Sequence, residues 1–219
     1  MTRAAASARA ALALLILAAL LSTAVGAARD GLLAQHLSYF TNQSNFLFVV
    51  LAVASLAPAA RRIPWWDDAR GAVAFYLAMT GIVYALLVAP LDELLRWDLG
   101  WTGIVLHRLA PLAALVDWVL TPRRRTPSAG RILWWQLYPV VFLVLTWGRG
   151  GFTAWYPYEF LDPTASSWGQ VLLTTAVVLI AFVTVAAAVH LLEGRARPHE
   201  VPAAGGPGPA GASRPTVRA

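Results

Sequence analysis

Six stretches of the chain are apolar for long enough to cross a membrane as helices, and this pattern limits the fold more than any other feature. A helix needs roughly 17 to 25 residues to cross the hydrocarbon layer. The stretches cover about residues 8–27, 37–57, 71–89, 101–120, 132–147 and 168–192. Only 13% of the 219 residues are charged, whereas soluble domains carry about 25%. We therefore expect an all-α fold, a polytopic bundle of six transmembrane helices within residues 1–193.

The composition changes after this bundle. Residues 194–219 are rich in Pro, Gly and Ala, carry scattered Arg and contain few large apolar side chains. A segment of this kind cannot bury enough apolar surface to fold. We expect a disordered cytoplasmic tail.

The arginines set the expected orientation, because positive residues gather in the cytoplasmic loops of membrane proteins. With the N-terminus inside, thirteen of the 17 basic residues fall in inner segments. The outer loops hold only Arg29, Arg96 and Arg149, and Arg108 lies within the fourth span. Both termini are therefore expected in the cytoplasm of a multi-pass protein of the cell inner (plasma) membrane. Its expected partners are membrane lipids and not nucleic acid, because this distribution accounts for the net charge of +6.

The first span also fits a second interpretation. A basic start, an apolar middle and the ending Val25-Gly26-Ala27 are typical of a cleavable signal peptide. The apolar run is long for a signal peptide, and cleavage would leave five helices. Both points favour a retained first helix.

A run of polar residues opens the second span. Thr41, Asn42, Gln43, Ser44 and Asn45 follow one another in "SYFTNQSNFLFVV", before the sequence becomes fully apolar. Lipid offers such groups no hydrogen-bond partner, so each needs one inside the protein. Thr41 and Asn45 share a helix face that should point to other helices. They serve either helix packing or a site, whereas for Gln43 and Ser44 helix packing is favoured.

The fourth span carries His107 in "LHRLAPLAALVDWVL". Ionisable side chains inside spans are rare and mark functional sites by default. His107 should lie roughly 9 Å below the outer end of its helix, and Thr41 roughly 6 Å below the start of its own, so they share a depth. Pro111 lacks the N–H that would bond the His107 carbonyl, which predicts a kink and an unpaired acceptor beside the imidazole. The alternative is a buried histidine bonded to a neighbouring helix.

Other groups near the spans have expected roles of their own. Arg108 either extends to the outer interface or holds an acidic ligand group. Asp117, near the inner surface, is expected to pair with Arg123 to Arg125. In the outer loop "GRGGFTAWYPYEFLDPTASS", Trp155 and Tyr158 form either an interfacial aromatic belt or part of a lid over a cavity.

Three motifs carry a resemblance to known proteins. The six spans, with "YFTNQSN" opening the second, "LHRLAPLAALVDWVL" as the fourth and "YPYEFLD" in the last outer loop, resemble a family of bacterial six-helix membrane proteins of unknown function. The resemblance covers about residues 8–192. More distantly, the layout is similar to that of the eukaryotic androgen-induced membrane hydrolases, which cleave fatty acid esters of hydroxy fatty acids with a threonine and a histidine. By position, those two residues correspond to Thr41 and His107.

This resemblance implies a specific chemistry. A neutral imidazole can take the proton of a hydroxyl nucleophile, which gives His107 and Thr41 their catalytic roles. The amide groups of Asn45 or Gln43 are candidates to stabilise an oxyanion. The expected substrate contacts are Asn45, Gln43, Arg108, Trp155 and Tyr158.

Three hypotheses for the function follow. The first is an intramembrane hydrolase of lipid-like esters, the second a non-catalytic binder or carrier of a small amphiphile, and the third a structural membrane protein without a site. No cofactor is expected, and a metal is not expected because His107 is the only histidine well inside a span. His36 and His190 sit at opposite ends of spans, and His199 lies in the tail. The chain contains no Cys, which excludes disulfides and thiol ligands.

The orientation is tested by reporter fusions. Fusions after Arg70 and Arg125 should report a cytoplasmic position, and fusions after Asp98 and Asp162 an extracytoplasmic one, because of the arginine bias. A cytoplasmic signal after Asp98 would contradict the orientation and put the candidate residues in the inner leaflet.

Overall fold

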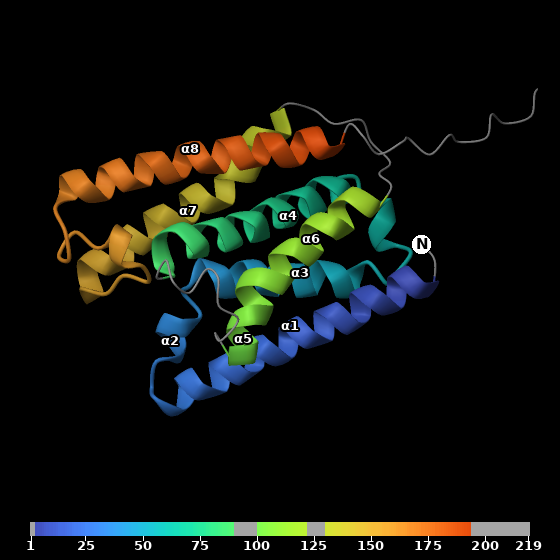
Figure 1. The fold of residues 1–219 in the computed structure, drawn as a ribbon, viewed down its shortest axis with the longest axis horizontal. Coiled ribbons are helices and arrows are strands. Elements are labelled where there is room, and N and C mark those ends of the chain that lie inside the picture. The colour runs from blue at the N-terminus through green and yellow to red at the C-terminus, as the bar shows by residue number, and fades with distance from the viewer. Residues whose placement is uncertain (1–2, 90–99, 122–129, 194–219) are drawn as a thin grey trace, which may run out of the picture.

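The computed structural model describes residues 3–89, 100–121 and 130–193, and its regular structure in these segments is all helical, without a strand (Figure 1). The expected tail, residues 194–219, lies outside the described residues. The α-helices are α1 (Arg3–Arg29), α2 (Leu33–His36), α3 (Phe40–Ala54), α4 (Trp66–Val83), α5 (Gly100–Ile104), α6 (Ala110–Leu120), α7 (Gly130–Thr153) and α8 (Trp168–Glu193). Short 3-10 turns are η1 (Ala60–Arg62) and η5 (Glu159–Leu161), and π-helical turns are η2 (Tyr84–Val88) and η4 (Val105–Leu109).

Four helices are long and apolar enough to cross a membrane. They cover Ala4–Arg29, Trp66–Val88, Gly100–Leu120 and Trp168–Leu192. In α1 and α8 only 22% of the most apolar window is buried inside the protein, against 56% in the window of Trp66–Val88. Large apolar side chains such as Leu14 and Ile180 point outward and are about two-thirds exposed. An apolar surface of this extent needs a lipid environment.

The helix of the second span begins later than expected. The expected span starts at residue 37, whereas α3 starts at Phe40 and is 15 residues long. The amide nitrogens of Asn42 and Gln43 donate to the carbonyl oxygens of His36 and Leu37, at 2.7 and 3.0 Å. These polar side chains therefore satisfy the backbone where the chain turns from α2 into α3.

Helix α4 is the centre of the bundle and contacts α3, α6, α7 and α8. It lies between the α7–α8 pair and the α1–α3 pair in Figure 1. Residues 71–80 are buried on every face of the helix. Gly71 allows this close packing, because a Cβ atom there would lie 2.4 Å from the Trp135 ring and 2.7 Å from the Trp118 ring.

The π-helical turn η4 comes just before Pro111, where the sequence predicts a kink. Pro111 has no N–H to donate to the His107 carbonyl, and the Ala110 N–H bonds Val105 O in the π pattern. A Cβ atom at Gly81 of α4 would lie 3.4 Å from the His107 carbonyl oxygen, so α4 packs closely against this turn. The helix is thus irregular at the position that the sequence predicts.

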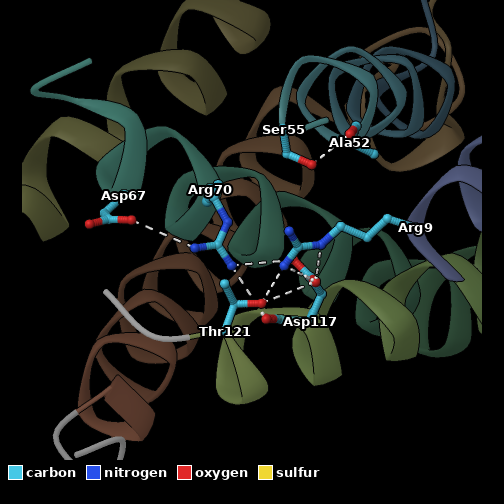
Figure 2. Close-up of polar contacts among 7 residues, drawn as sticks. All are labelled: Arg9, Ala52, Ser55, Asp67, Arg70, Asp117 and Thr121. Carbon is cyan, nitrogen blue, oxygen red and sulfur yellow. Dashed lines mark hydrogen bonds and ion pairs between the residues drawn. The ribbon is translucent and has the colours of Figure 1, made fainter. Parts of the chain in front are cut away.

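A cluster of buried charges joins α1, α4 and α6 at the end of the bundle where α1 begins and α8 ends (Figures 1 and 2). Arg9 and Asp117 form an ion pair at 2.5 Å, and Arg70 contacts the same carboxylate at 3.3 Å. Arg9 also donates to the Thr121 hydroxyl, and Arg70 pairs with Asp67 at 3.6 Å. Both arginine side chains are less than a tenth exposed.

Asp117 has charged partners that the sequence did not suggest. Arg9 and Arg70 are its ion-pair partners in the described residues, whereas the expected partners Arg123 to Arg125 lie outside those residues. Arg9 comes from the first helix, which thereby supplies a counter-charge to α6.

Replacing Asp117 tests the importance of this cluster. Asp117→Asn leaves the buried guanidinium of Arg9 with a neutral partner and that of Arg70 with Asp67 alone, so we expect the free energy of unfolding to fall by roughly 3 kcal/mol. The measurement is thermal or denaturant unfolding in detergent. Asp30→Asn, at an exposed aspartate after α1, is the control and should cost little. Equal stability of both variants would show that the cluster does not hold the helices together.

Candidate functional site

A cavity of about 530 Å³ lies at the opposite end of the bundle from the charge cluster. Its volume falls within the range of small-molecule pockets, about 300–1,000 Å³. Its wall comes from α1, α2, α3, α4 with η2, α5 with η4, α7, η5 with the loop before it, and α8. Most of these side chains are apolar, and a few polar groups lie among them. That mixture suits an amphiphilic molecule.

Thr41 and His107 both line this cavity. Thr41 belongs to the first turn of α3, and His107 to η4, which packs against α3. Asn45 connects the two elements, because its amide nitrogen lies 2.9 Å from Thr41 O and 3.2 Å from Leu106 O. The structure therefore brings the two residues into one cavity and links the backbone next to each of them.

The imidazole of His107 is held from two sides. Its Nδ1 lies 3.2 Å from the carbonyl oxygen of Gly103, and its ring stacks on Tyr84 with the centroids 3.9 Å apart. A carbonyl accepts only from an N–H, so this contact puts the proton of the neutral ring on Nδ1. The backbone carbonyl of Gly103 therefore orients the imidazole ring of His107.

Tyr84 was missed in the sequence because it lies in an otherwise apolar part of the third span. It is the first residue of η2, so both partners of the stacked pair lie on π-helical turns. Such turns are rare and occur often at functional sites. A tyrosine in a span followed by an apolar run gives no sequence signal for this geometry.

Tyr158 reaches the cavity from the loop before α8, next to Thr41. Burial raises the pKa of Tyr158 to about 12, and hydrogen bonds from the Thr41 side chain and from the backbone N–H groups of Thr41 and Phe40 oppose part of this rise. At neutral pH the phenol therefore keeps its proton. Its oxygen accepts hydrogen bonds at the N-terminus of α3, where helix N–H groups have no partner within the helix.

Four expected substrate contacts lie elsewhere. The Asn45 side chain is fully buried, and its amide nitrogen donates to backbone carbonyl oxygens. Gln43 donates to Leu37 O and accepts a 2.6 Å bond from the Tyr138 hydroxyl. Trp155 packs against the Arg149 guanidinium at 4.5 Å, and Arg108 is half-buried on η4. None of the four is among the described lining residues, so the roles expected for them in substrate contact are not supported by their positions.

The loop before α8 covers the cavity. Residues 157–161 line it, Leu161 is buried, and Trp147 Nε1 donates to Leu161 O at 3.3 Å. A Cβ atom at Gly150 would lie 2.2 Å from the Tyr156 ring, so this ring packs directly on the α7 backbone. Residues 157–161 therefore form part of the cavity wall, and Tyr156 before them packs against α7.

His36 is the second histidine of the cavity, and the sequence did not suggest it. The sequence places His36 at the end of a span. In the structure His36 belongs to α2, and its side chain contacts Thr23 of α1 and Asn42 of α3. Although His36, His107 and Glu159 share the cavity wall, no group of three His, Cys, Asp or Glu among the described residues could hold a metal ion.

Comparison with known proteins adds no further information on this site. No family model, no curated protein and no solved structure matches the chain.

Proposed function

We propose that the protein is a six-span protein of the plasma membrane whose outer cavity hydrolyses lipid-like esters, with Thr41 as nucleophile and His107 as base. The observation that carries the proposal is the presence of both side chains in one largely apolar cavity, on helices that Asn45 ties together.

The membrane arrangement behind this proposal includes α3 and α7. Both run alongside the four long apolar helices, and the start of α1 and the end of α8 lie at the same end of the bundle (Figure 1). An even number of crossings is consistent with that placement. The 24 residues of α7 give it a length of roughly 36 Å, enough to cross the hydrocarbon layer. With the arginine bias, the cavity would open toward the outer leaflet.

The first half of the reaction forms an acyl-enzyme. Because the Nδ1 proton of His107 faces Gly103 O, the lone pair of the neutral ring lies on Nε2. The Thr41 hydroxyl turns from the Tyr158 oxygen to His107 Nε2, and His107 accepts its proton as Oγ attacks the ester carbonyl carbon. The bond to the alcohol oxygen then breaks, and this oxygen leaves with the proton from His107.

The Tyr158 hydroxyl is the group best suited to stabilise the oxyanion. With a pKa of about 12 it remains protonated, and hydrogen bonds from the first N–H groups of α3 polarise it as a donor. A donor held in place before the reaction costs no reorganisation in the transition state. This role replaces the one expected for the amides of Asn45 and Gln43.

The second half of the reaction returns the enzyme to its starting state. A water molecule gives one proton to His107 and attacks the acyl carbon bound to Thr41 Oγ. The fatty acid leaves and Thr41 recovers its proton from His107. The overall reaction converts an ester and water to an acid and an alcohol, and it requires no cofactor.

Turnover of a fluorogenic fatty acyl ester by purified variants tests this proposal. Thr41→Ala and His107→Ala should each lower kcat by about 10³-fold or more, and Tyr158→Phe by about 10²-fold. Thr184→Ala is the matched control, because this threonine is exposed on α8 and bonds only Ile180 O of its own helix. Its kcat should equal that of the wild type.

The same experiment separates the hydrolase from the amphiphile carrier, which the apolar cavity wall also suits. A folded Thr41→Ala variant that turns over the ester at the wild-type rate would contradict the nucleophile role and favour the carrier. Loss of turnover together with retained binding of the ester would support catalysis.

A further inference from the structure

One polar part of the cavity wall has no role in the reaction proposed above. It consists of Thr23 from α1, His36 from α2 and Asn42 from α3, which we name the head-group wall. Thr23 Oγ1 lies 3.3 Å from His36 Nε2, and Asn42 Nδ2 lies 3.3 Å from both ring nitrogens of His36. Three distant parts of the chain thus meet around one imidazole that is only partly exposed.

The hydroxyl of Thr23 determines which nitrogen of His36 carries the proton. Thr23 has a single hydroxyl proton, which it donates to the carbonyl oxygens of Ala19 and Leu20, each at 3.1 Å. Toward His36 it can therefore only accept a hydrogen bond. The Nε2–H of His36 donates to Thr23, and Nδ1 carries the lone pair.

The backbone carbonyl of His36 orients the amide of Asn42. The Asn42 Nδ2 donates to His36 O at 2.7 Å and lies 3.3 Å from both ring nitrogens of the same residue. Burial lowers the pKa of His36, which keeps the ring beside the amide neutral. The amide nitrogen of Asn42 is therefore held against His36, and the side chain cannot turn over without losing its bond to His36 O.

The side-chain carbonyl oxygen of Asn42, Oδ1, is available to a ligand. Asn42 Oδ1 makes no hydrogen bond within the part of the chain that the structure describes, and Asn42 lines the cavity directly after Thr41 in the sequence. An amide oxygen is only an acceptor. This oxygen therefore favours a ligand that carries a hydroxyl or an N–H group.

The charge of the wall points to the same class of ligand. Glu159 lines the cavity with an exposed carboxylate, which is a second acceptor and a negative charge. Among the described lining residues there is no Arg that would favour an anion. A carboxylate on the ligand would face Asn42 Oδ1 and Glu159 without a compensating charge.

We propose that the head-group wall binds an uncharged polar head with a hydrogen-bond donor, so that the ligand of this cavity is a neutral hydroxylated lipid, of which a monoester of a polyol is the simplest case. The apolar remainder of the cavity takes the alkyl chain. The proposal rests on the proposed function only in its last step, which puts the ester bond of that lipid at Thr41.

Ether lipids test the binding step without any hydrolysis. The probes are an alkyl glycerol ether, the same ether with both hydroxyls methylated, and the alkyl carboxylate of equal chain length. The glycerol ether should bind the wild type about threefold to tenfold more tightly than the methylated ether, as one added hydrogen bond predicts. The carboxylate should bind more weakly than the glycerol ether. Affinity is read from displacement of a fluorescent alkyl probe in detergent.

Variants assign this preference to Asn42. Asn42→Leu should reduce the affinity ratio of the two neutral ethers to about one, because it removes the acceptor. Gln136→Leu is the matched control, since within the described residues the Gln136 amide bonds only Ile132 O on its own helix and Gln136 is not among the residues that line the cavity. It should keep the wild-type ratio. A ratio within one protein does not depend on how much of that variant is folded.

The outcomes are distinct for the two proposals. Equal binding of the two neutral ethers by the wild type, an unchanged ratio in Asn42→Leu, or tightest binding of the carboxylate would each overturn the head-group wall. Selective ether binding without turnover of any ester would support the wall and count against hydrolysis. Turnover of simple esters without a preference between the two neutral ethers would support hydrolysis and count against the head-group wall.

Discussion

The buried amide of Asn45 is the contact on which the proposed site depends. In lipid a polar side chain has no outside partner, so it must bond within the protein. The amide nitrogen of Asn45 does so with the carbonyl oxygens of Thr41 on α3 and Leu106 on η4, whereas its buried Oδ1 has no hydrogen-bond partner among the described residues. At the other end of the bundle Asp117 plays a comparable part, since its carboxylate holds Arg9 of α1 and Arg70 of α4 (Figure 2). A neutral contact beside the cavity and a charged contact at the opposite end of the bundle thus hold the helices together.

Irregular backbone explains why the cavity lies where it does. The turns η2 and η4 carry the stacked pair Tyr84 and His107, and both turns contribute to the cavity wall. At membrane depth such backbone is tolerated where it lines a cavity or packs against protein. Pro111 prevents a regular α-helix beside His107. Gly81, which has no side chain, lets α4 approach the carbonyl oxygen of His107. The π turn and the site are therefore two consequences of the same short sequence.

The sequence predicts the helical class and the apolar surface well, because both follow from long runs of apolar residues. It also predicts that Thr41 and His107 share a depth, since helix rise converts sequence position into depth, and both line the same cavity. It did not predict the placement of His36 or Tyr84, because their contacts arise from the short α2 and from π turns that have no periodic pattern. The partners of Gln43, Asn45 and Asp117 lie far away in the sequence, at Tyr138, Leu106 and Arg9. Such pairings depend on how the helices are arranged, which composition and spacing do not specify.

The central claim is that Thr41 is a nucleophile activated inside this cavity. A fluorophosphonate carrying a long alkyl chain, incubated with the purified protein, tests it most directly, with the modified residue located by peptide mass spectrometry. We expect one adduct, on Thr41 Oγ, and no adduct in His107→Ala, because the hydroxyl then has no base. An adduct on another residue, or labelling of Thr41 that does not depend on His107, would contradict the claim.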